Sequence, residues 1–289
     1  LPQQKREDGQ VPIFSSSGIT GTHSTAMVKA PGVITGRYGT IGEVFYAAKD
    51  FWPLNTTLFV EDFHGNDAKF IYYFLKTLEW SKFTSASAVP GINRNTVHKE
   101  IVSLPDVETQ RRIASTLSMF DEKIKINTEI NDNLQQQAMS LYAEMFLNSS
   151  DSNVTSGTLS DIAVITMGQS PSGSSYNEDG VGEVFYQGRA EFGFRFPKRR
   201  LFTTEPKRMA EAGDVLLSVR APVGDLNIAY ERCCIGRGLG AIHSKTGHSS
   251  FVLYTMFALR SQLDVFNGEG TVFGSINRDA LNAIPIDIP

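Results

Sequence analysis

The sequence predicts an α+β protein in which two related modules are joined by one long helix. Three observations predict this architecture. A pattern of short apolar strands, glycine turns and an apolar helix occurs twice, at a separation of about 182 residues. Between the copies lies a stretch with apolar residues at heptad spacing and neither Gly nor Pro. The 289 residues, 41% hydrophobic and 20% charged, have the composition of a soluble globular protein with room for two domains.

The first module is predicted over residues 1–105. Its central motif is Pro31-Gly-Val-Ile-Thr-Gly-Arg37, in which a glycine turn leads into an apolar strand that ends at an arginine. A second glycine turn and a second strand follow, and then an apolar helix near Phe70. The same order of elements returns in the second module, residues 158–289, where we match Arg220 to Arg37.

Each module closes with the same short sequence. Asn93 and Arg94 in the first copy match Asn277 and Arg278 in the second, and each pair precedes a short run of apolar residues and Pro. Asn is favoured at helix N-caps because its side-chain oxygen accepts a hydrogen bond from the first helical turn. We therefore predict a structural role for both Asn–Arg pairs, in which each asparagine caps a short helix.

The long helix is predicted over Val107–Leu147, within a spacer at residues 106–148. Its apolar residues follow alternating steps of four and three, with Asn127 and Asn131 as a polar layer in the seam. We expect this seam to pack on a second helix, and the alternative is a helix that folds back onto its own module. The residues expected to face the partner helix are Leu117, Phe120, Ile124, Leu134 and Leu141.

A polar stretch at residues 149–157 is predicted to be a solvated linker. The second module also begins with a lead-in, Leu159–Gly168, whose counterpart would precede Leu1. The long helix would have its own counterpart beyond Pro289. We therefore expect the chain to be part of a longer protein.

The sequence contains no catalytic or cofactor-binding motif. The phosphate loop of ATPases, the Rossmann glycine motif, the nucleophile elbow and the His-Glu-x-x-His zinc motif are absent. The adjacent Cys233 and Cys234 are too few to hold a structural zinc ion, and we predict two reduced thiols in a core strand of a cytoplasmic protein. No apolar run reaches the roughly 20 residues that cross a bilayer. These absences favour a binding protein.

Charge placement favours nucleic acid as the ligand. The net charge is −4, but residues 185–245 contain eleven Lys and Arg against six Asp and Glu, interleaved with aromatic residues. Lys and Arg neutralise phosphates, and Arg makes paired hydrogen bonds to guanine. The predicted DNA contacts are Ser17, Thr20, Arg37, Tyr38 and Lys82 in the first module, and Gln169, Ser172, Arg189, Arg195, Lys198, Arg199 and Arg200 in the second. Arg37 and Arg220 recur in both modules, which favours a structural role for them. Arg195 and Arg199 do not recur, so we favour them for sequence recognition.

Several motifs occur in a specific order along the chain: Gly36-Arg-Tyr-Gly-Thr-Ile-Gly42, Asp50-Phe-Trp-Pro-Leu-Asn55, Leu104-Pro-Asp-Val-Glu-Thr-Gln-Arg-Arg-Ile113, Leu216-Leu-Ser-Val-Arg-Ala-Pro-Val-Gly224 and Cys233-Cys-Ile-Gly-Arg-Gly-Leu-Gly240. In this combination the chain resembles the specificity subunit of type I restriction–modification enzymes. The resemblance implies two target recognition domains, one for each half of a bipartite DNA target, and spacer helices that pack antiparallel.

The resemblance also implies the partners of the chain. These are double-stranded DNA, two methyltransferase subunits, and restriction subunits that act as translocase and endonuclease. It implies a chain without catalysis of its own, in which S-adenosylmethionine, ATP and magnesium are bound only by the partner subunits. The alternative function is a duplicated protein-interaction adaptor without DNA specificity. Salt dependence distinguishes the two, because phosphate contacts weaken steeply as salt is added.

Overall fold

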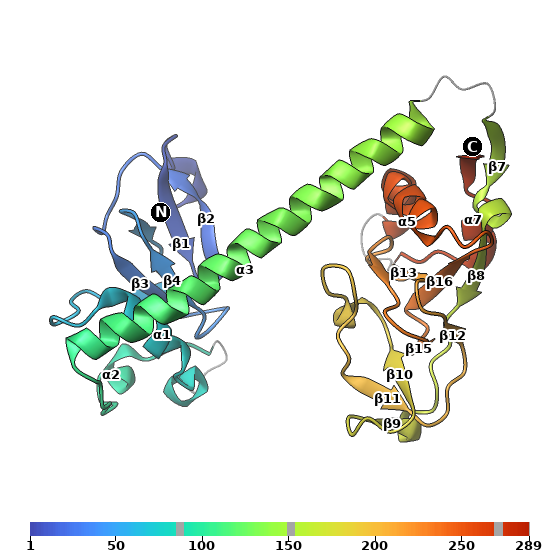
Figure 1. Cartoon of the computed structure of the whole chain (residues 1–289). Helices are drawn as coiled ribbons and strands as arrows, with labels where there is room; N and C mark the ends of the chain where they lie inside the picture. Colours follow the sequence, from blue (N-terminus) through green and yellow to red (C-terminus); the bar gives the residue numbers. More distant parts are fainter. Residues whose placement is uncertain (85–89, 149–153, 269–273, 289) are drawn as a thin grey trace. The chain divides into compact units, whose positions relative to one another are not determined.

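The structure is a computed structural model that describes residues 1–84, 90–148, 154–268 and 274–288 (Figure 1). The chain divides into two compact units, Leu1–Glu129 and Ile130–Pro289, which we call unit 1 and unit 2. Each contains both helices and short strands, and the predicted α+β class is confirmed. Residues 149–153 of the predicted linker, and Pro289, lie outside the described residues.

Unit 1 contains two three-stranded sheets. The first has the order β2 (Gly18–His23), β1 (Val11–Ser15) and β5 (Trp52–Pro53), in which β1 is antiparallel to β2 and parallel to β5. The second has the order β4 (Val44–Ala47), β3 (Gly32–Gly36) and β6 (Thr57–Phe59), all antiparallel. The helical segments are η1 (Gln3–Lys5), α1 (Ala68–Lys76), η2 (Trp80–Phe83), α2 (Arg94–Val97) and the first part of α3 (Val107–Tyr142).

Strand β3 is the centre of unit 1 because its two faces enter different cores. Val33 packs with Val44, Trp80 and neighbouring apolar residues, while Ile34 packs with Phe14, Phe51 and Ala47. Alternate residues of a strand point to opposite faces, so a strand that is apolar at successive positions is buried on both sides. The apolar run of the predicted central motif is thereby explained.

Unit 2 has the larger sheets. One has the antiparallel order β14 (Leu226–Ile228), β13 (Val215–Ser218), β16 (Leu239–Ser244) and β8 (Ala163–Met167). Another has the order β12 (Met209–Ala210), β15 (Cys233–Ile235), β10 (Glu183–Tyr186), β11 (Leu201–Thr203) and β9 (Tyr176–Asn177), with β10 parallel to β15. β17 (Pro285–Ile288) pairs with β7 (Thr155–Thr158). The helical segments are η3 (Ala143–Leu147), α4 (Leu159–Ile162), η4 (Gly173–Ser175), η5 (Arg189–Glu191), α5 (Ser249–Ala258), α6 (Arg260–Asp264), η6 (Val265–Asn267) and α7 (Arg278–Asn282).

The two units repeat one scaffold. The trio β4-β3-β6 corresponds to β14-β13-β16, and β2-β1-β5 corresponds to β11-β10-β15, with the same parallel and antiparallel pairings. The repeated glycine of the turn is required sterically. Gly42 and Gly224 both have positive φ, of 79° and 101°, and a Cβ on Gly42 would lie 2.6 Å from Trp80.

Hydrogen bonds correct one residue match of the repeat. The backbone N–H of Arg37 donates to the carbonyl of Thr56 (2.8 Å), and the N–H of Val219 donates to the equivalent carbonyl of Gly238 (3.0 Å). Arg37 therefore corresponds to the buried Val219, and Tyr38 corresponds to Arg220. The predicted match of Arg37 to Arg220 is therefore wrong by one position. It relied on the shared residue type, whereas the hydrogen bonds between strands define which positions are equivalent.

The long helix is confirmed as α3, which continues through the π-helical turn η3 to Leu147. Asp106 caps it, accepting hydrogen bonds from the backbone N–H (3.0 Å) and hydroxyl (2.8 Å) of Thr109, and these bonds lower the pKa of Asp106. Within unit 1, the buried Gln110 accepts from the N–H of Asp67 (2.9 Å) at the start of α1. Within unit 2, the Tyr142 hydroxyl lies 2.9 Å from that of Thr255 on α5.

Part of the predicted linker is ordered as a strand. Residues 155–157 belong to β7, which pairs antiparallel with β17 from the end of the second module. The pairing explains why a polar stretch becomes a strand, since its partner lies far away in the sequence. In the described part of the chain, no helix is long and apolar enough to span a membrane.

Candidate nucleic-acid interface

Three loops of unit 2 meet beside the strand ends of β8, β10 and β15. They are residues 168–175, residues 187–200 and residues 236–238. The N–H of Gln169 donates to the carbonyl of Ile235 (3.0 Å), and the N–H of Arg237 donates to the Ser170 hydroxyl (3.3 Å). The N–H of Gly238 donates to the carbonyl of Gln187 (3.2 Å). These bonds place the predicted contact Gln169, together with Ser170 and Gln187, beside the turn that contains Arg237.

The loop at residues 187–200, which we call the basic loop, is fixed to strand β14. The N–H of Ile228 donates to the carbonyl of Arg195 (2.9 Å), and the Asn227 side chain donates to the carbonyl of Gly193 (2.9 Å). Within the loop, the N–H of Lys198 donates to the carbonyl of Glu191 (2.8 Å). The loop therefore has a defined backbone, on which its side chains are held in place.

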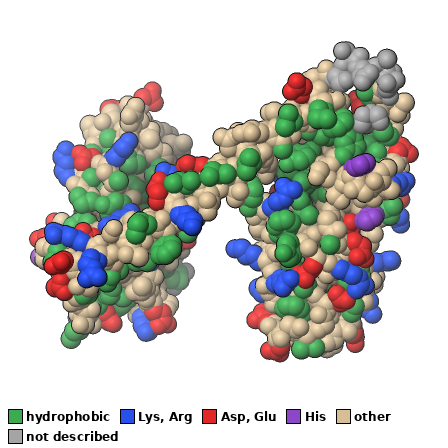
Figure 2. Space-filling model, in the orientation of Figure 1, with side chains coloured by type: hydrophobic (Ala, Val, Ile, Leu, Met, Phe, Trp, Pro, Cys, Tyr) green, Lys and Arg blue, Asp and Glu red, His purple; other side chains and the backbone are tan. Residues whose placement is uncertain are grey.

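Three arginines of the basic loop are paired with carboxylates. Arg189 pairs with Asp225, and Arg199 forms a two-pronged pair with Glu231 at 2.5 and 2.8 Å. Figure 2 shows Lys and Arg side chains beside Asp and Glu over unit 2. Arg189 and Arg199 help to hold the basic loop in place, because each is bonded to an acidic residue on another segment.

Arg200 is the third paired arginine, and its partner is buried. It donates to Glu191 at 2.8 Å, and the Glu191 side chain is only 4% exposed. The hydrogen bond to this carboxylate raises the pKa of Arg200, which stays charged throughout the physiological range. A buried carboxylate needs such a partner, so Arg200 has a structural role in the loop.

Arg195 and Lys198 are exposed and, among the described residues, have no carboxylate partner. The guanidinium of Arg195 lies 6.0 Å from the ring centroid of Phe196, which in turn packs edge-on against Tyr230 at 5.4 Å. Phe194 is also 52% exposed. Unpaired cations beside exposed aromatic rings have the chemistry that binds phosphates and base edges.

Arg237 is a candidate that the sequence prediction missed. It is exposed in the turn between β15 and β16, and Ser170 and Gln187 lie beside this turn. The sequence did contain a signal for this residue, namely its position between Gly236 and Gly238, because a glycine turn exposes the charged side chain at its centre. The equivalent turn of unit 1, between β5 and β6, contains the exposed Asn55.

Ser172 lies in the loop after β8, where its hydroxyl is 2.8 Å from that of Ser174 and its carbonyl accepts from the N–H of Ser175. In unit 1, Ser17 lies in the β1–β2 turn, and the Ser16 carbonyl is 2.9 Å from where a Cβ on Gly36 would lie. The turn therefore abuts the end of β3, which Arg37 and Tyr38 follow.

Two other predicted contacts of unit 1 lie on separate elements. Thr20 is exposed on β2, where its carbonyl accepts from Arg6 at 2.8 Å. Lys82 lies in η2 and pairs with Glu79 at 2.6 Å, and this carboxylate raises the pKa of Lys82. No described side-chain contact joins either residue to Arg37 or Tyr38, but Phe83, which follows Lys82, accepts a hydrogen bond from the N–H of Asn93 (3.1 Å).

An open polar pocket of about 520 Å³ lies where β3 ends. Its lining includes Arg37, Tyr38, Asn93, Arg94 and Asn95. The guanidinium of Arg37 lies 4.8 Å from the Tyr38 ring centroid. The N–H of Ile92 donates to the carbonyl of Arg37 (3.0 Å), which joins the strand end to the segment that leads into α2.

Both predicted asparagine caps are confirmed. The side-chain oxygen of Asn93 accepts from the N–H of Asn95 (3.0 Å) at the start of α2. The side-chain oxygen of Asn277 accepts from the N–H of Ala280 (2.9 Å) at the start of α7. The asparagines are thus engaged in the fold, whereas the arginines that follow them are exposed.

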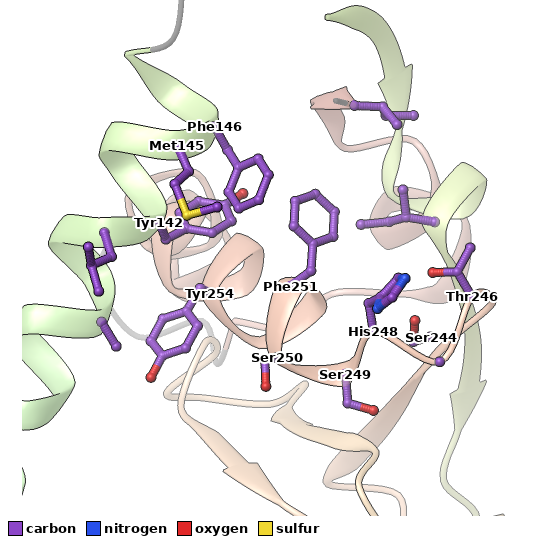
Figure 3. Close-up of a pocket in the computed structure, with 15 residues that line it drawn as sticks. Tyr142, Met145, Phe146, Ser244, Thr246, His248, Ser249, Ser250, Phe251 and Tyr254 are labelled. Atoms are coloured by element: carbon purple, nitrogen blue, oxygen red, sulfur yellow. The ribbon is translucent and has the colours of Figure 1, made fainter.

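An apolar groove of about 820 Å³ lies in unit 2 between the end of α3 and α5. Figure 3 shows the rings of Tyr142, Phe146 and Phe251 gathered at its wall. Phe146 packs edge-on against Phe251 at 5.1 Å, and burial raises the pKa of the Tyr142 phenol. Leu141, one of the predicted helix-packing residues, also lines this groove.

The predicted helix-packing residues are exposed along α3. The exposed fractions are 37% for Leu117, 60% for Phe120, 65% for Ile124, 58% for Leu134 and 57% for Leu141. Figure 2 shows hydrophobic side chains at the surface of this helix. A continuous row of exposed apolar side chains is unfavourable in water and is typical of an interaction surface.

Comparisons with known proteins point to one family. A model of the type I restriction modification DNA specificity domain matches residues 1–136. The specificity subunit of the type I restriction enzyme MjaX from Methanocaldococcus jannaschii is 32% identical over 243 residues, which cover 76% of this chain and 57% of that protein. The HindI specificity subunit of Haemophilus influenzae is 32% identical over 89 residues, or 30% of this chain and 19% of that subunit.

The chain therefore spans little more than half the length of the first of these relatives. A solved structure shows the same fold: the S subunit of a type I restriction-modification system from M. genitalium aligns with a TM-score of 0.60 and 17% identity. The alignment covers 100% of this chain and 80% of that one. The matched domain and the relatives place the chain in the family of type I restriction–modification specificity subunits.

Proposed function

We propose that the chain recognises a bipartite DNA target, with one module on each half-site. One observation carries the proposal: the two modules share a scaffold but differ in the segments that connect equivalent strands. Ser16 and Ser17 connect β1 to β2, whereas the whole basic loop connects β10 to β11. A shared scaffold with different loops is what two related domains need in order to contact different base sequences.

Within the second module, the unpaired cations are the proposed DNA contacts. Arg195, Lys198 and Arg237 are exposed and have no acidic partner in the segments that the structure describes. The paired Arg189, Arg199 and Arg200 support the loop. Gln169 and Ser172 lie on the neighbouring loop, and their polar side chains suit hydrogen bonds to base edges or phosphates.

The exposed seam of α3 supports a second proposal, that this helix packs on an equivalent helix. Burial of the seam would remove apolar surface from water, which stabilises the packed helices by roughly 25 cal/mol for each Å² buried. The groove between α3 and α5 continues the same surface, because Leu141 belongs to both. A rigid pair of helices would hold the two modules at a fixed separation.

The proposed partners follow from the family. They are double-stranded DNA, two methyltransferase subunits and restriction translocase–endonuclease subunits. In this proposal the chain supplies recognition and no catalysis, and S-adenosylmethionine, ATP and magnesium are bound by the partner subunits. Among the described residues there is no cluster of three His, Cys, Asp or Glu that would hold a metal ion.

Salt dependence of binding tests the proposal. The chain, assembled with its methyltransferase subunits, is titrated with duplexes that contain the methylated motif, with one half-site scrambled, or with both scrambled. We expect affinity to fall steeply with salt, by about 0.9 log units per log unit of salt for each phosphate contact. Loss of either half-site should weaken binding. Assembly without salt-dependent DNA binding would favour the protein-interaction adaptor instead.

A further inference from the structure

The polar pocket at the end of β3 contains two arginines with no acidic partner. Arg37 and Arg94 both line it, with the amides of Asn93 and Asn95 and the ring of Tyr38. No described carboxylate pairs with either arginine. The Nε of Arg37 is buried and has no hydrogen-bond partner among the described atoms. A buried donor without a hydrogen-bond partner costs free energy. An acceptor oxygen of a ligand that bonded to this Nε would remove that cost.

Unit 2 repeats the backbone hydrogen bonds of this site, and its first arginine stands one position later. Val219 takes the place of Arg37, but Arg220 follows it, and Arg278 takes the place of Arg94. The N–H of Ile276 donates to the carbonyl of Val219 (3.1 Å), as that of Ile92 does to Arg37. Arg220 and Ser275 form the same backbone bridge as Tyr38 and Gly91. Both arginines of unit 2 are exposed, and no described carboxylate pairs with them.

The arginines that open the short helices are not explained by helix capping. The helix caps are made by Asn93 and Asn277, so Arg94 and Arg278 are not needed there. In each unit one arginine follows the central strand and the other opens the short helix, although the strand arginine occupies a different position. The recurring property is thus one arginine just after the central strand and one at the start of the short helix, in each unit.

We propose that each arginine pair, Arg37 with Arg94 and Arg220 with Arg278, binds a phosphodiester of the DNA backbone. Guanidinium groups make short, charge-assisted hydrogen bonds to phosphate oxygens. Phosphates are the same in every sequence, so a contact to them recurs in both modules, whereas contacts to bases differ. The inference rests on the proposed DNA recognition and deepens it: the arginine pairs set the position of each module on the duplex, and the loops contact the bases.

The test compares Arg94→Gln and Arg278→Gln with Lys49→Gln. Lys49 is an exposed cation after β4 with no described partner, so its variant removes the same charge elsewhere in unit 1. Affinity for a target duplex and a random duplex is measured at several salt concentrations, in the assembled complex. We expect each arginine variant to lose about tenfold on both duplexes. The salt slope should fall by about one, with unchanged target preference.

The outcomes separate the pocket from the wider function. Arginine variants that match Lys49→Gln, or that change the preferred sequence, would overturn the phosphate proposal. Binding of inorganic phosphate alone, observed by calorimetry without any effect of Arg94→Gln on DNA affinity, would mark a small-anion site and also overturn it. If the wild-type complex showed no target preference, the proposed function would fail. A reduced salt slope in Arg94→Gln would still support the pocket.

Discussion

Among the arginines of the basic loop, the partner of each side chain decides its role. Arg199 is held at both Nε and Nη2 by Glu231, whereas the guanidinium of Arg195 lies near the ring of Phe196 and has no carboxylate partner among the described residues. To contact DNA, Arg199 would first have to leave its carboxylate. Arg195 has no such bond to break, so it is the better candidate for base contact.

This difference predicts opposite phenotypes for two similar substitutions. Arg195→Gln should relax the sequence requirement of one half-site and cost about 1–3 kcal/mol of target binding. Arg199→Gln should leave the preferred sequence unchanged and lower stability by less than about 1 kcal/mol, because the Arg199–Glu231 pair is partly exposed. Methylation mapping and urea unfolding measure the two effects. A changed motif in Arg199→Gln with normal stability would reverse the assignment.

The cap of α7 predicts a purely structural effect. Asn277→Ala removes the acceptor for the N–H of Ala280 and should lower the free energy of unfolding by about 1 kcal/mol. Asn277→Asp, which keeps an acceptor oxygen, is the control and should retain most of the stability. Both variants should methylate the same motif as the wild type. A new motif in Asn277→Ala would place this residue at the DNA instead.

The thiol of Cys233 should be inert in the folded protein. Burial, followed by the nearby charge of Asp214, raises the pKa of Cys233 to about 12. A raised thiol pKa favours the neutral form, so at pH 8 only about one thiol in ten thousand is the reactive thiolate. We expect iodoacetamide to leave Cys233 unmodified at pH 8 and to alkylate it in urea, as detected by mass spectrometry. Equal rates in both conditions would contradict the buried location.

At the scale of elements, α3 links the structure to the proposed spacing of the half-sites. Its two ends pack on the equivalent helices α1 and α5, through Gln110 and Tyr142 respectively. Four residues inserted in the exposed middle of the helix would lengthen it by about 6 Å. Because B-DNA rises about 3.4 Å per base pair, the gap between half-sites should grow by one or two base pairs.

Methylation mapping of the insertion variant checks this expectation. The half-site sequences should stay as in the wild type, because the insertion leaves both sets of loops untouched. An insertion of the same length in the solvent-facing loop at residues 178–182 is the control and should leave the gap unchanged. A variant with the original gap and a changed half-site would show that α3 does not set the spacing.

Elements whose signal is local were predictable from the sequence. The heptad pattern predicted α3, and the turn glycines predicted β3, β13 and the strands after them. Strand β7 was assigned to a linker, because nothing in its own polar residues indicates pairing with β17. The ion pairs of the basic loop were equally hidden, since Arg199 and Glu231 lie on separate segments that only the fold brings together.

At the scale of the whole molecule, the duplication was visible in the sequence, but its register was not. Sequence matching paired Arg37 with Arg220 because the residue type agreed, while the hydrogen-bond ladder pairs Tyr38 with Arg220. Residues near the site are therefore comparable between modules only after the strands are aligned.

The short β1–β2 turn has a practical consequence for engineering. Phe14 and Tyr186 accept equivalent hydrogen bonds from Leu54 and Gly236, so the two strands enter their turns from matching positions. The segment that begins at Gln187 is thus a cassette whose insertion point in the other half of the chain begins at Ser15, the residue after Phe14. Transplanting it, together with the acidic residues that anchor it, offers a route to a chimera with a new target while the strand pairings from Phe14 inwards stay in place.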